Sequence, residues 1–424
     1  MKRNDSSFQQ KHINAPHHFK RQRILGFTQL ATMLINRLVK GISVEIFTFL
    51  NSVTPERTCT KQAFSKARKK LKHTAFIELN AFYVTAFYES TLYRSYQNKF
   101  RLLAVDGSLC QLPAAKQLIT HFGQWKNKTA KGMPMGRASL VYDVYNRVVV
   151  SGRLASLEKS ETDLFREQYE HISSQSDTLD KSLYLMDRGY PSHDLCTMMA
   201  RNGDFFLIRC KKDFCKPVTE FVHSDKQEAL ILLNPTLWYT KKGEKRGSRF
   251  KEPLTVRIVR IKLSAGRYEY LLTNMEQASH DELNELYALR WGVETYYDYL
   301  KDSMELENFS AKTVEGVLQD FHACLLGSNL VNMLINEAEE ELQEQQTDKK
   351  NKYTYQINRK TATGILRNQV ISILFLEKDI PAKLEQLKKQ IKSSKTAIVP
   401  HRKFPRFKKR RSARKFHMPK KKAL

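Results

Sequence analysis

Residues 96–210 alternate β-rich runs with helical patterns, and this alternation restricts the fold more than any other feature of the chain. The β-rich runs are bounded by Gly, Asn, Ser or Pro and lie at 100–112, 138–156, 182–192 and 204–210. Apolar residues at helical spacing lie between or after them, at 156–172 and 193–203. Strands that alternate with helices in this way predict an α/β core.

The N-terminal region, 1–95, has a helical pattern throughout. Apolar residues at spacings of three and four predict a helix over 24–42, and Thr60 is placed to cap a second helix that runs to about Lys72. That second helix carries Lys61, Lys66, Arg68, Lys69, Lys70 and Lys72. Its basic side chains suit docking onto DNA, and they suit a solvated face of an ordinary helical bundle equally well.

The sequence pattern of the second half of the chain changes twice. Residues 211–280 contain strand-like segments such as PVTEFV and LTVRIVRIKLS, separated by turn residues, and predict an all-β insertion. Helices return over 281–342 as a second part of the core. Residues 343–424 form a C-terminal region, with a polar linker at 343–352, helices to about Lys392 and a tail from His401 with twelve Lys or Arg and no acidic residue.

The charge of the chain favours a polyanion as its partner. Lys and Arg number 72 against 44 Asp and Glu, a formal net charge of +28, and nucleic acid is the common polyanion. No apolar run reaches the roughly 18 residues that span a bilayer, and the basic N-terminus lacks the apolar segment of a secretory signal. The six cysteines form no CxxC pair, which favours reduced thiols in a cytoplasmic protein over zinc ligands or disulfides.

Two aspartates stand where a strand ends. Asp106 follows LLAV and precedes Gly107, and Asp187 follows LYLM and precedes Arg188 and Gly189. A buried strand holds its last side chain rigidly at the edge of the sheet, and a glycine beside it leaves room for a ligand. A turn-capping aspartate is the alternative for each one taken singly. Asp143 lies within a predicted hairpin and is interpreted as a structural residue of the turn.

Residues 287–301, YALRWGVETYYDYLK, place four polar residues at helical spacing. On one continuous helix Tyr287, Arg290, Glu294 and Lys301 would lie within about one sixth of the circumference, along a line about 21 Å long. An Arg290–Glu294 ion pair on a surface helix is the simpler alternative. The position downstream of two strand-end aspartates favours a catalytic role instead.

Three carboxylates, Asp106, Asp187 and Glu294, are the donor set that two Mg²⁺ or Mn²⁺ ions prefer, because hard divalent cations take oxygen ligands. Two such ions activate the attacking oxygen and stabilise the leaving oxygen at a phosphodiester. Arg290 and Lys301 beside Glu294 would then hold DNA phosphates, and the Tyr287 hydroxyl is able to donate to one.

These residues resemble the insertion-sequence-four family of bacterial DDE transposases. Its Tyr-x2-Arg-x3-Glu-x6-Lys signature is matched by the residues of 287–301, its first aspartate motif by VDGS at Asp106, and its second by DRGY at 187–190. The resemblance covers about residues 50–330. It implies a ribonuclease-H-like mixed sheet with flanking helices, interrupted by the β insertion, between helical N- and C-terminal regions. The 1–95 region would bind DNA.

The resemblance also implies a mechanism and partners. Asp106, Asp187 and Glu294 would bind two Mg²⁺ ions, for which Mn²⁺ substitutes, to nick double-stranded DNA at the terminal inverted repeats of the element. The freed 3′ hydroxyl would then attack, through a hairpin or directly on target DNA. A synaptic homodimer, associated with the bacterial nucleoid, would do this work. Arg209 and Arg188 are further DNA contacts, and Tyr268, Tyr270 or Trp238 is a candidate to stack on a flipped base. A plain nuclease and a non-catalytic DNA-binding relative are the alternatives.

Overall fold

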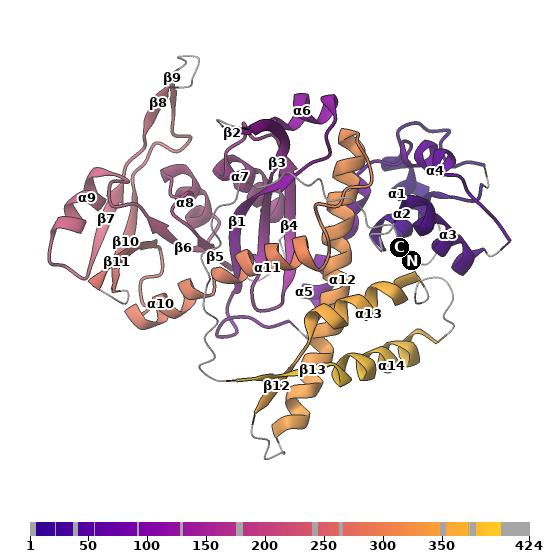
Figure 1. Ribbon diagram of the computed structural model, residues 1–424. Helices are drawn as coiled ribbons and strands as arrows, with labels where there is room; N and C mark the ends of the chain where they lie inside the picture. The colour runs from indigo at the N-terminus through magenta and orange to yellow at the C-terminus, as the bar shows by residue number, and fades with distance from the viewer. Residues whose placement is uncertain are drawn as a thin grey trace. The chain divides into compact units, whose positions relative to one another are not determined.

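The computed structural model places most of the chain (Figure 1). The residues that it describes are 6–21, 23–36, 41–54, 56–90, 93–127, 130–174, 181–239, 245–262, 266–347, 353–371, 373 and 379–399. The chain divides into two compact units. The core unit comprises Tyr83–Leu109 and Arg137–Tyr297, and the terminal unit comprises Met1–Phe82, Cys110–Gly136 and Asp298–Leu424. The basic tail from His401 lies outside the described residues.

A mixed sheet of nine strands runs in the order β2-β3-β1-β5-β6-β11-β10-β7, and β4 pairs with β3 (Figure 1). The strands are β1 (Arg101–Gln111), β2 (Gln124–Asn127), β3 (Ala130–Asp143), β4 (Val148–Ala155), β5 (Ser182–Met186), β6 (Phe205–Cys210), β7 (Glu228–Leu233), β10 (Leu254–Lys262) and β11 (Tyr268–Thr273). The pairs β1–β5 and β5–β6 are parallel. The pairing of β11 with β6, β10 with β11 and β7 with β10 is antiparallel.

One apolar cluster covers a face of this sheet in the core unit. It joins Val105 of β1 and Met186 of β5 to three helices, α7 (Glu161–Ser174), α8 (His193–Arg201) and α9 (Lys216–His223). Phe165, Tyr169 and Tyr190 are among its fully buried aromatic rings. Strands buried in this way read as nearly continuous apolar runs, which is why their sequence pattern was clear.

The opposite face of the sheet meets α11 (Trp291–Asp302). Tyr142 of β3 points away from the α7 side, because its neighbour Val141 belongs to the apolar cluster there. The Tyr142 ring stacks on Tyr296 of α11 with 4.1 Å between ring centroids. The core of this unit is therefore a sheet with helices against both faces, and its predicted α/β class is confirmed.

The predicted all-β insertion is wrong. Residues 216–223 form helix α9, where the sequence analysis expected a strand at PVTEFV. Pro217 lies in the first turn, where a missing N–H costs nothing, and Val218 and Phe221 are buried one turn apart. The strands β7, β10 and β11 extend the core sheet instead of building a separate one. The small pair of β8 (Leu237–Tyr239) and β9 (Lys245–Gly247) stands outside it.

The terminal unit is mainly helical, as predicted for both ends of the chain. Its N-terminal helices are α1 (Ser6–Lys11), α2 (Phe27–Ile35), α3 (Ile42–Val53), α4 (Lys61–Arg68) and the first part of α5 (Thr74–Glu89). They share a core with Ala323 of the long helix α12 (Val314–Thr347). The single helix predicted over 24–42 is therefore two helices in the described part of the region.

The C-terminal part of this unit packs on the second half of α12. Its elements are β12 (Thr354–Ile357), α13 (Arg359–Ile371), α14 (Ile380–Ser393) and β13 (Lys395–Ile398), and the unit also contains α6 (Lys116–Phe122). The α12 helix continues through Gln343 to Thr347, so the polar linker predicted at 343–352 begins at least five residues later. Strand β12 pairs with β13, a pairing that the sequence did not predict. None of the helices in the described part of the chain is long and apolar enough to cross a bilayer.

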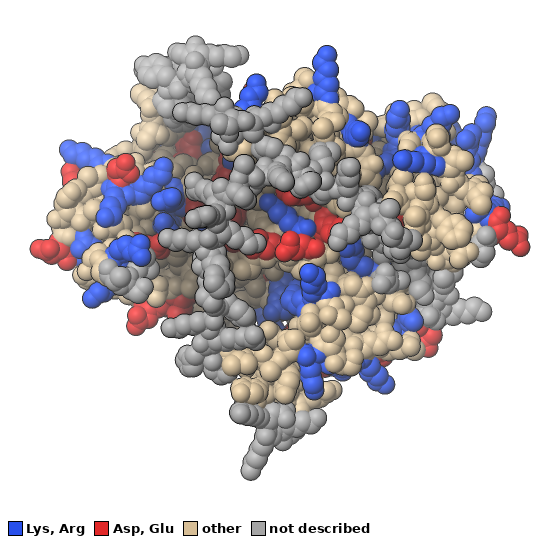
Figure 2. Space-filling model, viewed as in Figure 1, with Lys and Arg blue, Asp and Glu red and all other residues tan. Residues whose placement is uncertain are grey.

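Helix α4 begins as predicted, because the Thr60 side chain accepts a hydrogen bond from the Ala63 N–H at 3.1 Å. It ends at Arg68, four residues before the predicted end. Lys61, Lys66 and Lys69 are exposed, and Lys and Arg side chains stand out over this part of the molecule in Figure 2. Arg68 is different, because it points into the unit and is only 5% exposed.

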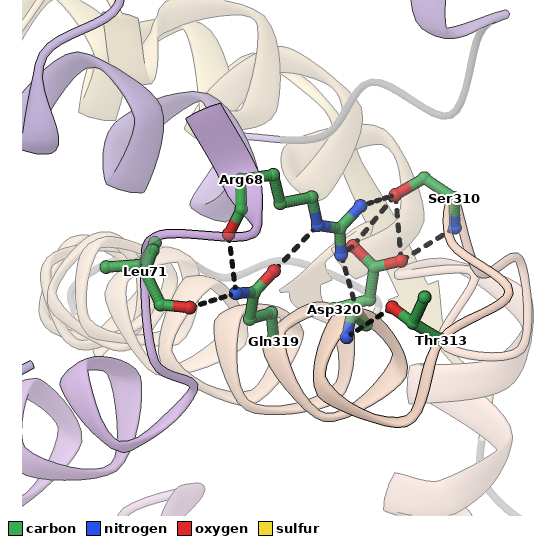
Figure 3. Close-up of polar contacts among 7 residues, drawn as sticks. Arg68, Leu71, Ser310, Thr313, Gln319 and Asp320 are labelled. Carbon is green, nitrogen blue, oxygen red and sulfur yellow. Dashed lines mark hydrogen bonds and ion pairs between the residues drawn. The ribbon is translucent and has the colours of Figure 1, made fainter. Parts of the chain in front are cut away.

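The Arg68 guanidinium lies in a polar network with α12 and the segment before it (Figure 3). Its nitrogen atoms donate to the Gln319 and Ser310 side chains at 2.7 and 2.5 Å, to the Gly316 carbonyl at 2.5 Å and to the Asp320 carboxylate at 2.8 Å. The Gln319 amide in turn donates to the Leu71 carbonyl at 2.6 Å. One residue of the predicted basic face is therefore a structural cation of the bundle.

Candidate active site

The register of β1 and β5 brings the two aspartates side by side. Asp187 follows the last residue of β5, as predicted, but Asp106 lies within β1, because that strand continues to Gln111. Val105 pairs with Met186 in this parallel ladder, so Asp106 and Asp187 are the next residues on two adjacent strands that point the same way. Val105 faces the α7 side, so Asp106, the next residue of β1, projects toward the face that α11 covers. Asp187, just beyond β5, lies at the edge of the ladder. The sheet thus holds the two aspartates on adjacent strands.

Asp106 is held in a buried position with other acidic groups near it. Burial raises its pKa to about 7, and the negative charges of Glu294 and Asp187 act in the same direction. The Gly107 N–H and the Arg290 charge oppose this rise. A cation bound beside this buried carboxyl group would favour its ionised form.

Helix α11 is attached to β1 at the backbone of Asp106. The Tyr297 hydroxyl donates to the Asp106 carbonyl at 3.1 Å, and the Tyr297 side chain is buried. This bond joins the element that carries Glu294 to the strand that carries Asp106.

Substitution of Tyr297 by phenylalanine removes that bond. We expect the free energy of unfolding to fall by about 0.5–1.5 kcal/mol, because the Asp106 carbonyl loses a donor. DNA cleavage should fall by less than about tenfold, since the β1–β5 ladder still holds Asp106. Urea unfolding followed by circular dichroism and a nicking assay measure the two effects. An unchanged unfolding midpoint would show that this bond contributes nothing to the fold.

The helix predicted over 287–301 is interrupted. Tyr287 lies near the end of α10 (His280–Ala288), Leu289 and Arg290 form a turn, and α11 begins at Trp291. In this turn the Leu289 N–H donates to the Leu286 carbonyl, three residues back, so the winding is tighter than in an α-helix. The four signature residues therefore do not line one face of a single helix.

Arg290 and Glu294 form an ion pair at 2.6 Å across the first turn of α11. Burial lowers the pKa of Arg290, but the hydrogen bond to Glu294 and the charges of Tyr287, Glu294 and Asp106 together outweigh that effect, and the pKa is raised. The side chain of Arg290 is 10% exposed and that of Glu294 is 35% exposed. Arg290 is thus a buried cation that fixes the position of the Glu294 carboxylate.

Tyr287 and Arg209 lie near the same group of charges. The Arg290 guanidinium lies 5.7 Å from the centroid of the Tyr287 ring. Burial raises the pKa of Tyr287 to about 12, against the opposing charges of Arg290 and Arg209. Arg209 on β6 forms an ion pair with Glu269 of β11 at 2.7 Å. The core unit therefore brings both residues to the neighbourhood of Arg290.

The remaining predicted DNA contacts are placed differently. Arg188 is exposed in the loop after β5. Lys301 lies on α11 but falls in the terminal unit, where it forms an ion pair with Glu307 at 3.6 Å. Of the aromatic candidates, Tyr270 is buried, which removes its ring from a stacking role, and Tyr268 is 41% exposed. Trp238 is on β8, and the structure does not describe its side chain.

Asp143 has the structural role that the sequence analysis gave it. It is fully buried at the turn between β3 and β4. Its Oδ1 accepts from the Tyr145 and Asn146 N–H groups at 3.0 and 2.9 Å, and its Oδ2 accepts from the Tyr88 hydroxyl at 2.7 Å and the Asn146 amide at 2.8 Å. These bonds use the acceptor capacity of the carboxylate for the turn.

Two residues that lie near the aspartates were given no role by the sequence analysis. Glu161 is the first residue of α7, and the sequence analysis placed it only within a helical pattern. Tyr190 ends the DRGY motif, and its side chain is fully buried. Its hydroxyl has no hydrogen-bond partner within the described ranges. Only the tertiary fold shows that these residues are neighbours of Asp106 and Asp187.

The acidic residues fit a divalent cation by their chemistry. Carboxylate oxygens are the ligands that Mg²⁺ prefers, the Asp106 carboxyl group is buried near two other acids, and the Tyr190 hydroxyl has no partner among the described residues. As the side chains stand, however, no three His, Cys, Asp or Glu residues in the described part of the chain are grouped to hold a metal ion. Glu294 is paired with Arg290, and Asp187 Oδ1 accepts from the Gly189 N–H at 2.6 Å.

Comparison with known proteins identifies the family. Residues 97–330, more than half of the chain, match the family described as the transposase DDE domain. The chain belongs to the DDE transposase family. The matched range contains Asp106, Asp187, Glu294 and the whole Tyr-Arg-Glu-Lys signature.

This DDE transposase is 24% identical over 238 residues to the transposase InsG for insertion sequence element IS4 of Escherichia coli strain K12. The match covers 54% of this chain and 51% of InsG, so the chain spans about half the length of that relative. A solved structure, the piggyBac transposase synaptic complex with hairpin DNA, has 10% identity and a TM-score of 0.43. That comparison covers 88% of this chain and 79% of the other.

Proposed function

We propose that this DDE transposase mobilises a bacterial insertion sequence by hydrolysing phosphodiester bonds at the element ends and joining the freed strand to target DNA. The observation that carries the proposal is the β1–β5 register, which sets Asp106 beside Asp187. Burial is the main cause of the raised pKa of Asp106, and the negative charge of Glu294 raises it further. Glu294 therefore acts on the same site. We further propose that the core is ribonuclease-H-like.

Asp106, Asp187 and Glu294 are the residues that would hold two Mg²⁺ ions, with Mn²⁺ as a substitute. When bound, the ions supply an activated attacking oxygen and charge stabilisation at the leaving oxygen. We propose that Glu294 gives up its pairing with Arg290 when it joins the two aspartates. Arg290, once released, is available to hold a DNA phosphate as a bidentate fork. Tyr287, Lys301, Arg209 and Arg188 are the further phosphate contacts that we propose.

The proposed partners are the terminal inverted repeats of the element, target DNA and a second copy of the chain in a synaptic homodimer. The net charge of +28 supports binding of a polyanion. We propose that residues 1–95 and the basic tail bind DNA, while residues 96–210 and 281–342 perform catalysis. The place of action would be the bacterial cytoplasm, at the nucleoid.

The test is a cleavage and joining assay with the purified full-length chain. The substrate is linear DNA with the native flanks of the gene, and a supercoiled plasmid serves as target. With Mg²⁺ we expect 3′ ends freed at the element boundary and joined to the plasmid, and no product when EDTA removes the metal. Nicks without joined products would make the protein a nuclease. Binding without nicks in Mg²⁺ or Mn²⁺ would make it a non-catalytic relative.

A further inference from the structure

The carboxylate of Glu161 lies against the backbone beside Asp106. A Cβ added to Gly107 would stand 2.6 Å from Glu161 Cδ and 2.8 Å from its Oε1, so only glycine leaves room for this carboxylate. A Cβ added to Gly189 would stand 3.9 Å from Glu161 Oε2 and 3.3 Å from Asp187 Oδ1. Glu161 therefore reaches the two glycines that follow the two aspartates of the site.

Two contacts, one made by Glu161 and one by its neighbour Thr162, hold the start of α7 in this position. Arg137 on β3 donates from Nη1 to Glu161 Oε1 at 2.6 Å. The hydroxyl of Thr162, the next residue of α7, donates to the Gly189 carbonyl at 3.3 Å. The start of α7 is thus tied to β3 on one side and to the loop after Asp187 on the other.

The buried hydroxyl of Tyr190 points to a ligand at the same place. Among the described residues it has no hydrogen-bond partner, and its side chain is fully buried. Burial and then the charges of Glu161, Asp106 and Asp187 raise the pKa of Tyr190 well above its ordinary value. A buried polar group without a partner destabilises the fold. A water molecule ordered by a cation among these three carboxylates would give the hydroxyl a partner.

We infer that Glu161 is a fourth acidic residue of the divalent-cation site, held over Gly107 by Arg137 and adjoining both aspartates. The inference rests on the proposed function. It assigns to Glu161 the stabilisation of the bound cation or of its ordered water, and to Arg137 the positioning of Glu161. Glu161 also supplies an acidic group that is already in place while Glu294 is still paired with Arg290.

An ordinary ion pair is the competing explanation. Glu161 is 33% exposed and Arg137 is 25% exposed, and a pair that water screens in this way contributes little to stability. That explanation predicts a small change in stability on substitution and no change in cation affinity. It also gives no reason for the close approach of the carboxylate to Gly107.

Binding of Mn²⁺ to the full-length protein without DNA separates the two explanations. We expect Glu161→Gln to weaken Mn²⁺ binding by about tenfold or more, measured by electron paramagnetic resonance of free Mn²⁺. Glu158→Gln is the matched control, because Glu158 is exposed three residues earlier in the same segment. Gly107→Ala is expected to weaken binding in the same direction, since its methyl group displaces the Glu161 carboxylate. Asp106→Asn is the reference for loss of the site.

Each outcome decides the inference. Wild-type Mn²⁺ affinity in Glu161→Gln and Gly107→Ala, together with weak binding in Asp106→Asn, would overturn it and leave the proposed function standing. Unchanged affinity in Asp106→Asn would overturn the proposed site as well. Circular dichroism melts establish that each variant is folded. If Glu161→Gln unfolds, Glu161→Asp, which keeps the charge and shortens the reach, is compared with Gly107→Ala, and wild-type affinity in both again overturns the inference.

Discussion

Glu294→Gln is expected to abolish DNA cleavage while DNA binding stays intact. Glutamine keeps the shape of the side chain and its place on α11, but it removes the negative charge that acts on Asp106 and that would hold a cation. The cleavage rate should fall by about a thousandfold or more, since electrostatic stabilisation of the reacting phosphate is lost. Nicking of end-labelled element DNA and an electrophoretic mobility shift measure the two properties on one preparation.

Asp298→Asn is the matched control for this substitution. Asp298 lies four residues later on α11, is exposed, and loses the same charge. The control should cleave at the wild-type rate. Equal cleavage by Glu294→Gln and wild type would contradict the role of Glu294. A loss of DNA binding in Glu294→Gln would instead show that the Arg290–Glu294 pair is needed to shape the DNA-binding surface.

Arg68→Ala is expected to lower the free energy of unfolding by about 3–5 kcal/mol, one of the largest single effects on stability in the chain. The substitution leaves the buried Asp320 carboxylate without its cation, and it leaves the Gln319 side chain and Gly316 carbonyl without a donor. Asp320 still accepts from the Ser310 N–H at 2.6 Å, so part of its hydrogen bonding survives. The free energy of unfolding falls because the buried Asp320 carboxylate loses its cation. The charge on the surface of the protein hardly changes.

Chemical unfolding of Arg68→Ala and of Lys66→Ala tests this prediction. Lys66 is exposed on the same helix, so its substitution should change the free energy of unfolding by about 0.5 kcal/mol or less. Similar shifts in the two variants would mean that the Arg68 network contributes little. If α4 also contacts DNA, Lys66→Ala lowers DNA affinity and its salt dependence without loss of stability.

Features of the active site that depend on local chain geometry could be predicted from sequence. A strand that is buried on both faces reads as an apolar run, so LLAV and LYLM located β1 and β5 and thereby Asp106 and Asp187. The end of β1 was not predictable in this way, because the strand continues past Asp106 to Gln111. The cap at Thr60 was equally local, since its hydroxyl bonds to a residue three positions later. The partner strands of β7, β10 and β11 were not predictable, because strand pairing depends on distant segments.

The errors have distinct physical causes. The helical wheel for 287–301 assumed one continuous helix, whereas the tight turn at Leu289 and Arg290 places Tyr287 on a separate one. The strand predicted at PVTEFV overlooked Pro217 as a helix-starting residue. Glu161 and Arg68 gave no signal, because their partners lie 24 and more than 240 positions away in the sequence.

The parallel register of β1 and β5 makes Asp106 and Asp187 a rigid pair. The same backbone ladder holds both residues, so a change in the packing beneath the sheet moves them together and preserves the spacing between their carboxylates. Glu294 lies on α11, outside this ladder, so the ladder does not set its distance from the pair. Core substitutions under the sheet should therefore preserve the distance between the two aspartates. Insertions or deletions at Leu289 and Arg290 would move Glu294 and leave the β1–β5 ladder intact.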